Sequence, residues 1–225
     1  MRTLLDLVLP LECAGCGVPG EQWCRRCEQA LSVPPVRVRP RVDPGVPCWA
    51  LGTYTGPRRN GVIALKERGR RAVSVPFGRA LAGAVHQLRA AGEIDPPELS
   101  PLVLVCAPSR ARAARARGGD PVLRCARNAA TELAPERVSV PHLLKMAGGV
   151  RDSVGLSAGQ RQHNVAGRIE LIGQSRPAIG RPRTDELTVL LVDDVVTTGA
   201  TLAECARVLT DFGISLAGAI VVASA

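Results

Sequence analysis

One segment, residues 189–202, constrains the fold of this chain more than any other. Its first four residues are apolar, and they lead directly into two acids, Asp193 and Asp194. The sequence Thr-Thr-Gly-Ala-Thr at 197–201 then opens a stretch with helical apolar spacing that ends before Gly213. A short continuous apolar run is typical of a strand buried on both faces, and the periodic stretch after the turn indicates a helix. We therefore expect a strand–turn–helix unit within a parallel sheet that is flanked by helices.

The same alternation of strands and helices extends over most of the chain. A short continuous apolar run predicts a strand at 102–106, and we expect further strands at 138–144, 188–192 and 214–223. Helical spacing predicts helices at 63–68, 77–90, 122–133 and 200–212. Asp120 is the candidate N-cap of the third helix, and Pro121 takes its first helical position. Residues 146–167 are rich in Gly and polar groups and indicate a long loop, so the fold class expected is α/β.

The turn at 197–201 has the composition of a site for a phosphorylated sugar. Free backbone N–H groups at the start of a helix attract phosphate, and Gly199 lets the backbone approach closely and form a concave nest. The hydroxyls of the three threonines add donors. Asp193 and Asp194 then suit the two ribose hydroxyls as acceptors. The alternative is an ordinary turn in which Asp and Thr act as caps. The pattern of a Walker A loop is absent.

A basic segment follows the predicted strand 102–106. It contains Ser109, Arg110 and three further arginines up to Arg117. Ligands of open α/β sheets bind at the carboxyl ends of strands, and several guanidinium groups there could neutralise a diphosphate through bidentate contacts. The alternative is a solvated, Arg-rich helix face.

Two Cys-x2-Cys pairs stand near the N-terminus. Each pair can turn two thiolates toward one ion, which gives a tetrahedral site formed by Cys13, Cys16, Cys24 and Cys27. A segment of about 30 residues has too little core to fold alone, so we expect a structural Zn²⁺. The alternatives are a redox dithiol motif or chance. The remaining cysteines are expected to be buried thiols: Cys48, Cys106, Cys125 and Cys205.

Composition sets the remaining bounds. The chain has 225 residues, of which 46% are hydrophobic, enough for one domain with a small appendage. Its net charge of +9 favours polyanionic partners, although an Arg bias spread over the chain explains the charge equally well. Aromatic residues make up only 2%, which argues against recognition of single strands by base stacking. No apolar run reaches the roughly 18–20 residues that span a bilayer, so we expect a cytoplasmic protein without a membrane span.

These patterns divide the chain into three parts. Residues 1–31 form the four-cysteine segment, and residues 32–48 form a Pro- and Arg-rich linker that is extended where its prolines cluster. Residues 49–225 form the α/β domain that carries the predicted phosphate site.

The motifs resemble those of a known family. Asp193-Asp194 followed by Val-Val-Thr-Thr-Gly-Ala-Thr is similar to the motif with which type I phosphoribosyltransferases bind 5-phosphoribosyl pyrophosphate (PRPP). The segments 54–57 and 63–69, the four N-terminal cysteines and the polar residues of 152–164 resemble the ComF family of competence-associated, phosphoribosyltransferase-like proteins. The chain departs from that family at Cys106-Ala107-Pro108 and Gly119-Asp120-Pro121.

The resemblance implies a transferase that moves a phosphoribosyl group from PRPP, with Mg²⁺, to an unknown acceptor and releases pyrophosphate. It implies catalytic roles for Asp193 and Asp194, a hood at 146–167, and a set of PRPP-binding residues: Thr197, Thr198, Gly199, Ala200, Thr201, Ser109 and Arg110. The alternative is a non-catalytic adaptor that senses PRPP or a nucleotide. Such an adaptor would engage single- or double-stranded DNA, or a DNA-processing protein, through the cysteine segment and the Arg-rich surface.

Overall fold

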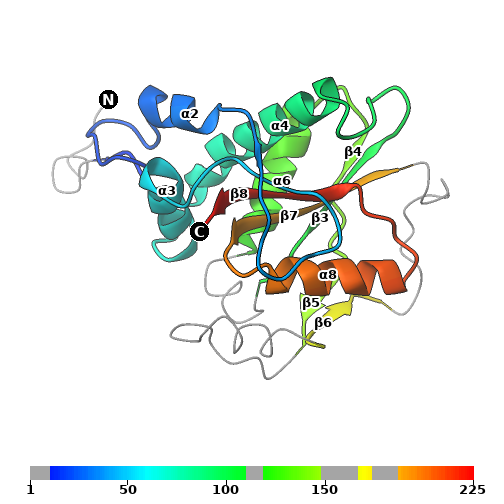
Figure 1. The fold of residues 1–225 in the computed structure, drawn as a ribbon. Helices are drawn as coiled ribbons and strands as arrows, with labels where there is room; N and C mark the ends of the chain where they lie inside the picture. Colours follow the sequence, from blue (N-terminus) through cyan, green and yellow to red (C-terminus); the bar gives the residue numbers. More distant parts are fainter. Residues whose placement is uncertain (1–10, 110–118, 148–166, 174–186) are drawn as a thin grey trace.

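A six-stranded, mostly parallel sheet forms the centre of the protein (Figure 1). The structure is a computed structural model and describes residues 11–109, 119–147, 167–173 and 187–225. In spatial order the strands are β1 (Val36–Arg37), β2 (Cys48–Ala50), β8 (Gly218–Ser224), β7 (Thr188–Val196), β3 (Leu102–Cys106) and β4 (Val138–Ser139). Every neighbouring pair is parallel except β1 with β2. The predicted α/β fold with a parallel sheet is confirmed.

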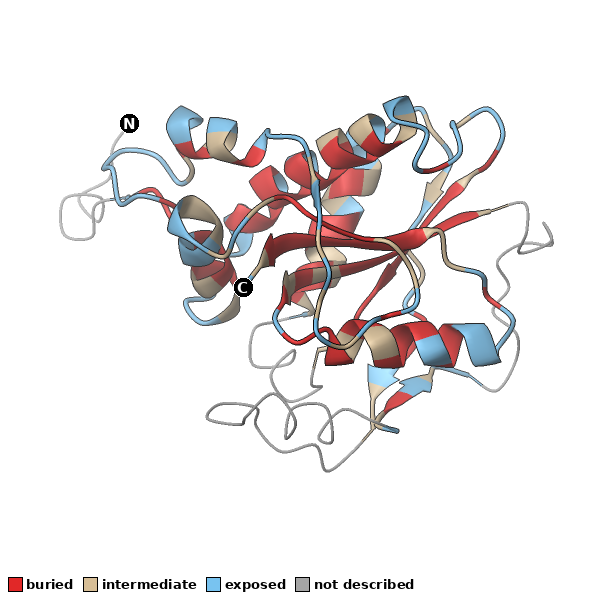
Figure 2. Ribbon diagram, viewed as in Figure 1, coloured by how far each residue is buried: buried red, intermediate tan, exposed pale blue. Residues whose placement is uncertain are grey.

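Helices cover both faces of this sheet. One face carries α3 (Gly56–Lys66), α4 (Ser74–Ala90) and α6 (Pro121–Glu132), and the other carries α8 (Ala200–Asp211) (Figure 1). Side chains alternate between the faces of a strand. Leu190 and Val192 of β7 therefore pack with the first group of helices, whereas Val189 and Leu191 pack with α8. The central strands are buried on both faces, as Figure 2 shows.

Local sequence signals set several element ends where we expected them. The Asp120 carboxylate accepts hydrogen bonds from the N–H groups of Val122 and Leu123 at 2.9 and 3.2 Å. Asp120 is therefore the N-cap of α6, which begins at Pro121. α8 ends just before Gly213, which has a φ of +75°. A left-handed glycine after the last turn is a common helix stop.

Three strands differ from their predicted bounds, and one of them is β7, which continues to Val196 instead of ending at residue 192. The predicted strand 138–144 is divided into β4 and β5 (Leu144–Met146), and β5 pairs antiparallel with β6 (Ile169–Leu171) in a separate two-stranded sheet. Pro141 lies between them, and a proline cannot donate to a ladder. The last strand begins at Gly218 instead of residue 214. A Cβ at Gly218 would lie 2.3 Å from the Trp49 ring, so the glycine permits close packing of β8 against β2.

Residues 32–48, expected as a linker, contain the edge strand of the sheet. Val36 and Arg37 make up β1, which pairs antiparallel with β2, and Cys48 already belongs to β2. Two further short elements complete the described chain: α2 (Arg25–Leu31) precedes this segment, and the 3₁₀ turn η1 (Arg71–Val73) leads into α4. The prolines of this segment lie outside both strands, in the stretches before β1 and between β1 and β2.

Some expectations fall outside the described residues. They concern Arg110 with the arginines up to Arg117, and nearly all of the predicted hood at 146–167. Among the helices that are described, none combines the length and the apolar character needed to traverse a bilayer.

Candidate functional site

The polar residues of segment 189–202 lie at the carboxyl edge of the sheet. β7 continues through both acids to Val196, while its partner β3 ends opposite Val192. Asp193 and Asp194 therefore occupy a stretch of β7 that extends beyond β3. The carboxyl edge of an open α/β sheet is where such folds bind ligands.

The two carboxylates leave β7 toward opposite faces. Asp194 lies on the face of α3, α4 and α6, where it is 6% exposed, and its Oδ2 is 2.6 Å from Nζ of Lys66. Asp193 lies on the side of α8. Burial, and then the charge of Asp193, raises the pKa of the thiols of Cys48 and Cys205 in the core beneath that helix. Instead of the two neighbouring acceptors expected from the sequence, strand alternation presents one carboxylate to each face.

The surroundings of Asp193 favour its protonated form. Burial, together with the negative charge of the adjacent Asp194, raises the pKa of Asp193 to about 8. The Lys66 ammonium and the N–H of Asp194, which donates to Asp193 Oδ1 at 2.8 Å, act in the opposite direction. Asp193 therefore exchanges a proton near neutral pH, and a bound cation would favour its charged form.

The turn between β7 and α8 starts the helix with a concave backbone. Thr197 is exposed, whereas Thr198 is buried and its Oγ1 accepts the N–H of Ala200 at 3.3 Å. Gly199 adopts a φ of +88° at the N-cap. Within the described part of the chain, the N–H of Thr201 in the first turn has no hydrogen-bond acceptor. Such an amide, aligned with the helix axis, is suited to an anion.

A loop from the N-terminal part of the chain covers one side of this turn. Segment 38–47 joins β1 to β2, and the N–H of Val42 donates to the Thr198 carbonyl at 2.8 Å. A Cβ at Gly199 would lie 2.4 Å from the Val42 carbonyl oxygen and 2.6 Å from Pro40 Cβ. Gly199 is thus required by its backbone conformation and also by the close approach of this loop, and only the first reason could be seen in the sequence.

Ser109, at the predicted pyrophosphate loop, is bonded within the protein. Its N–H donates to Asp120 Oδ2 at 3.1 Å, and its hydroxyl donates to the same oxygen. The other oxygen of Asp120 caps α6. Asp120 therefore fixes the segment after β3 to the start of α6, and both donors of Ser109 are engaged.

The four N-terminal cysteines come together as predicted. Their sulfur atoms all lie within 4.8 Å of one another, with Cys13 and Cys27 at 3.6 Å and Cys16 and Cys24 at 3.5 Å. Four thiolates around a tetrahedral Zn²⁺ lie about 3.8 Å apart, given a Zn–S bond of roughly 2.3 Å. The cluster therefore has the donor type, number and spacing that fit a structural zinc ion.

Backbone amides prepare this cluster for a metal. Burial opposes ionisation of Cys13, but the N–H groups of Cys24, Cys16 and Gly15 lower its pKa to about 6. Burial raises the pKa of the Cys27 thiol above its usual range. Without a metal, Cys13 thus ionises readily, whereas Cys27 favours its neutral thiol. A divalent cation would stabilise the thiolate form of both.

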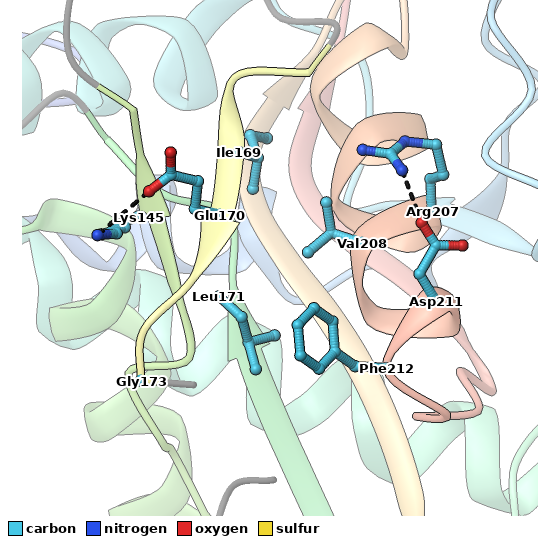
Figure 3. A pocket seen from close by; sticks show the side chains of 9 residues that line it. All are labelled: Lys145, Ile169, Glu170, Leu171, Gly173, Arg207, Val208, Asp211 and Phe212. Atoms are coloured by element: carbon cyan, nitrogen blue, oxygen red, sulfur yellow. Dashed lines mark hydrogen bonds and ion pairs between the residues drawn. The ribbon is translucent and has the colours of Figure 1, made fainter. Parts of the chain in front are cut away.

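A hollow of about 450 Å³ lies between α8 and the β5–β6 pair (Figure 3). Its charged residues pair with each other: Lys145 Nζ lies 3.2 Å from Glu170, and Arg207 lies 2.6 Å from Asp211. Phe212, at the end of α8 opposite the Thr/Gly turn, forms part of its apolar wall. Because these charges are already neutralised, we assign no phosphate to this hollow.

Two residues near the site had no such role in the sequence analysis. Lys66 is one of only two lysines among 29 basic residues. In a chain that otherwise uses Arg, a lysine is the signal that could have indicated a position where a compact ammonium group pairs with a specific acid. Asp120 was expected only as a helix cap. Its second contact, with Ser109, depends on how the fold brings β3 beside α6.

Comparisons with known proteins add little to this geometry. No protein-family model and no curated protein sequence matches the chain. Among solved structures, the chain is similar to hypoxanthine-guanine phosphoribosyl transferase from L. donovani, with 16% identity and a TM-score of 0.37. The likeness covers 67% of this chain and 71% of that one. A likeness this distant bears on neither substrate nor activity.

Proposed function

We propose that this protein binds PRPP with Mg²⁺ and transfers its phosphoribosyl group to an acceptor, as a ComF-type relative of the type I phosphoribosyltransferases. One observation carries the proposal. Two acids, Asp193 and Asp194, lie at the carboxyl end of the central strand β7, directly before a Thr-Thr-Gly turn that opens α8. An anion site beside carboxylates at the carboxyl edge of the sheet suits a sugar phosphate.

Each part of PRPP has a candidate partner at this edge. The 5′-phosphate would meet Thr197, Thr201 and the first amides of α8, and the ribose hydroxyls would meet Asp193 and Asp194, one from each face of the end of β7. Arg110, with Ser109 if it releases Asp120, would meet the pyrophosphate. Transfer breaks the bond between ribose C1′ and the pyrophosphate oxygen, and the electron pair of that bond leaves with pyrophosphate. The acceptor atom bonds to C1′ and gives up its proton to solvent. Mg²⁺ held by carboxylate and phosphate oxygens would stabilise that leaving group.

The four-cysteine segment completes the proposal with a structural Zn²⁺. All four ligands come from the protein, so the ion would have no open position for substrate. Its role would be to hold residues 11–31 folded against the domain.

Titration calorimetry with PRPP and Mg²⁺ tests the binding site. We expect the wild type to bind and the double variant Asp193→Asn/Asp194→Asn to bind at least about a hundredfold more weakly, since hydrogen bonds to charged groups contribute roughly 1.5–3 kcal/mol each. Asp211→Asn, at the far end of α8 and exposed, serves as the matched control and should bind like the wild type. Absence of PRPP binding by the wild type would contradict the proposal.

Pyrophosphate release separates catalysis from sensing. PRPP, Mg²⁺ and a panel of nucleobases and amines would be incubated with the zinc-loaded protein. Release that depends on one acceptor supports the transferase. Binding without release by any acceptor favours the non-catalytic, PRPP-sensing alternative.

A further inference from the structure

Helix α3 is attached to the four-cysteine segment along its first half. Asn60 Nδ2 donates to the Gly15 carbonyl at 2.8 Å, between the first two cysteines of the cluster. Arg58 donates to the Ala30 carbonyl at the end of α2. These contacts join α3 to both Cys-x2-Cys pairs, because α2 begins immediately after Cys24.

Tight packing reinforces this attachment. A Cβ at Gly61 would lie 2.6 Å from Phe77 and 3.0 Å from Trp23. These two rings meet edge to face, with centroids 5.7 Å apart and an interplanar angle of 82°. Trp23 belongs to the cysteine segment and Phe77 to α4, so the first half of α3 is held between the segment and the domain core.

The opposite end of α3 reaches the proposed phosphoribosyl site. Lys66 is its last residue, and the Lys66 Nζ lies 2.6 Å from Asp194 Oδ2. The Asp194 side chain is only 7% exposed, whereas that of Lys66 is 35% exposed. An acid in this position depends on its partner, because removing one member of a buried ion pair leaves an uncompensated charge.

A single rigid element therefore connects the metal cluster to the acid. Asn60 and Lys66 are six residues apart, which is about 9 Å along a helix at a rise of 1.5 Å per residue. We propose that the four-cysteine segment regulates the phosphoribosyl site through α3, because its hold on Asn60 keeps Lys66 in place against Asp194. Lys66 is then a positioning residue. The predicted effect on PRPP binding rests on the proposed function, whereas the coupling between the cysteine cluster and Lys66 does not.

Two variants and their combination test the route. In zinc-loaded protein, Asn60→Ala should raise the PRPP dissociation constant about fivefold or more, within the range of coupling between sites. Lys66→Met should raise it at least as much. The double variant should bind PRPP like Lys66→Met alone. Both changes remove the same connection between the cysteine cluster and Asp194, and the effects of two such changes do not add.

Asn128→Ala is the matched control. Asn128 Nδ2 also makes one hydrogen bond between elements, to Ser74 Oγ at 3.0 Å, but it lies on α6 away from the line from Gly15 to Asp194. The PRPP dissociation constant of Asn128→Ala should match that of the wild type. An Asn60→Ala protein that is folded, zinc-loaded and within twofold of wild-type affinity would overturn the inference, and so would losses that multiply in the double variant.

Amide hydrogen exchange tests the coupling without any ligand. Chelation of zinc, or Asn60→Ala, should accelerate exchange at residues 62–66 of α3 and leave β3 protected. If the wild type binds no PRPP, the proposed function fails while this result still decides whether α3 transmits the state of the cluster. Unchanged exchange at 62–66 under both treatments would overturn the coupling.

Discussion

At the scale of single residues, the site depends on how three charged groups share a small volume. Asp193 and Asp194 are adjacent in sequence, and the Lys66 ammonium lies against the second. The fold therefore compensates one acid with a cation and leaves the other with a pKa of about 8. A ligand that brings Mg²⁺ would supply the missing positive charge, so binding should release a proton at neutral pH.

The raised pKa of Asp193 predicts how stability changes with pH. The folded state binds a proton up to about pH 8, whereas an unfolded Asp loses it near pH 4. The wild type therefore loses stability as pH rises between those values. Asp193→Asn removes this effect, so its stability advantage over the wild type should be larger at pH 9 than at pH 5. Urea denaturation of both proteins at each pH measures it, and an equal difference at the two pH values would contradict the raised pKa.

At the scale of elements, the junction between β7 and α8 is the most constrained point. Its turn must start a helix, present amides at the sheet edge and accept the loop 38–47 against Gly199. These demands come from different parts of the chain. The N-terminal loop is thus part of the support of the proposed phosphate site, although it lies about 150 residues earlier in sequence than that site.

Replacing Gly199 should disturb this junction more than an ordinary glycine substitution. Gly199→Ala combines a positive φ with a Cβ 2.4 Å from the Val42 carbonyl, and we expect about 2–4 kcal/mol of destabilisation. Gly83→Ala is the control, because Gly83 is helical and its Cβ would meet no atom within 4 Å. It should stabilise α4 by roughly 0.5–1 kcal/mol. Chemical denaturation would compare the two, and similar effects would refute the role given to Gly199.

At the scale of the whole molecule, the four-cysteine segment and the α/β domain are packed as one unit. Trp23 enters the core of the domain beside Phe77, and Asn60 and Arg58 bond the segment to α3. Loss of a metal from the cluster should therefore lower the stability of the α/β domain as well as that of residues 11–31.

Metal analysis and thermal melting test this dependence. The purified wild type should hold about one zinc per chain, and Cys27→Ser should lose it and melt at a lower temperature because a buried ligand is removed. Cys48→Ala, a buried cysteine outside the cluster, should retain the metal. A wild type that holds less than about half a zinc per chain would argue against the site.

Much of the architecture followed from local pattern alone. The apolar runs at 102–106 and 188–192 predicted β3 and the first part of β7, and the Asp120-Pro121 pair predicted where α6 begins. The strand expected at 138–144 was divided because Pro141 interrupts it, and β1 was missed because a two-residue edge strand among prolines has no periodicity to detect.

The sequence by itself determined the strand–turn–helix unit with its two acids and the four clustered thiols, because strand burial, helix starts and Cys-x2-Cys spacing are set by residues close together in the chain. Only the tertiary structure decided which charge Asp194 meets, which donor engages Asp120 and what lies against Gly199. Those contacts join residues 11 to 159 positions apart, and their geometry depends on how the sheet orders its strands.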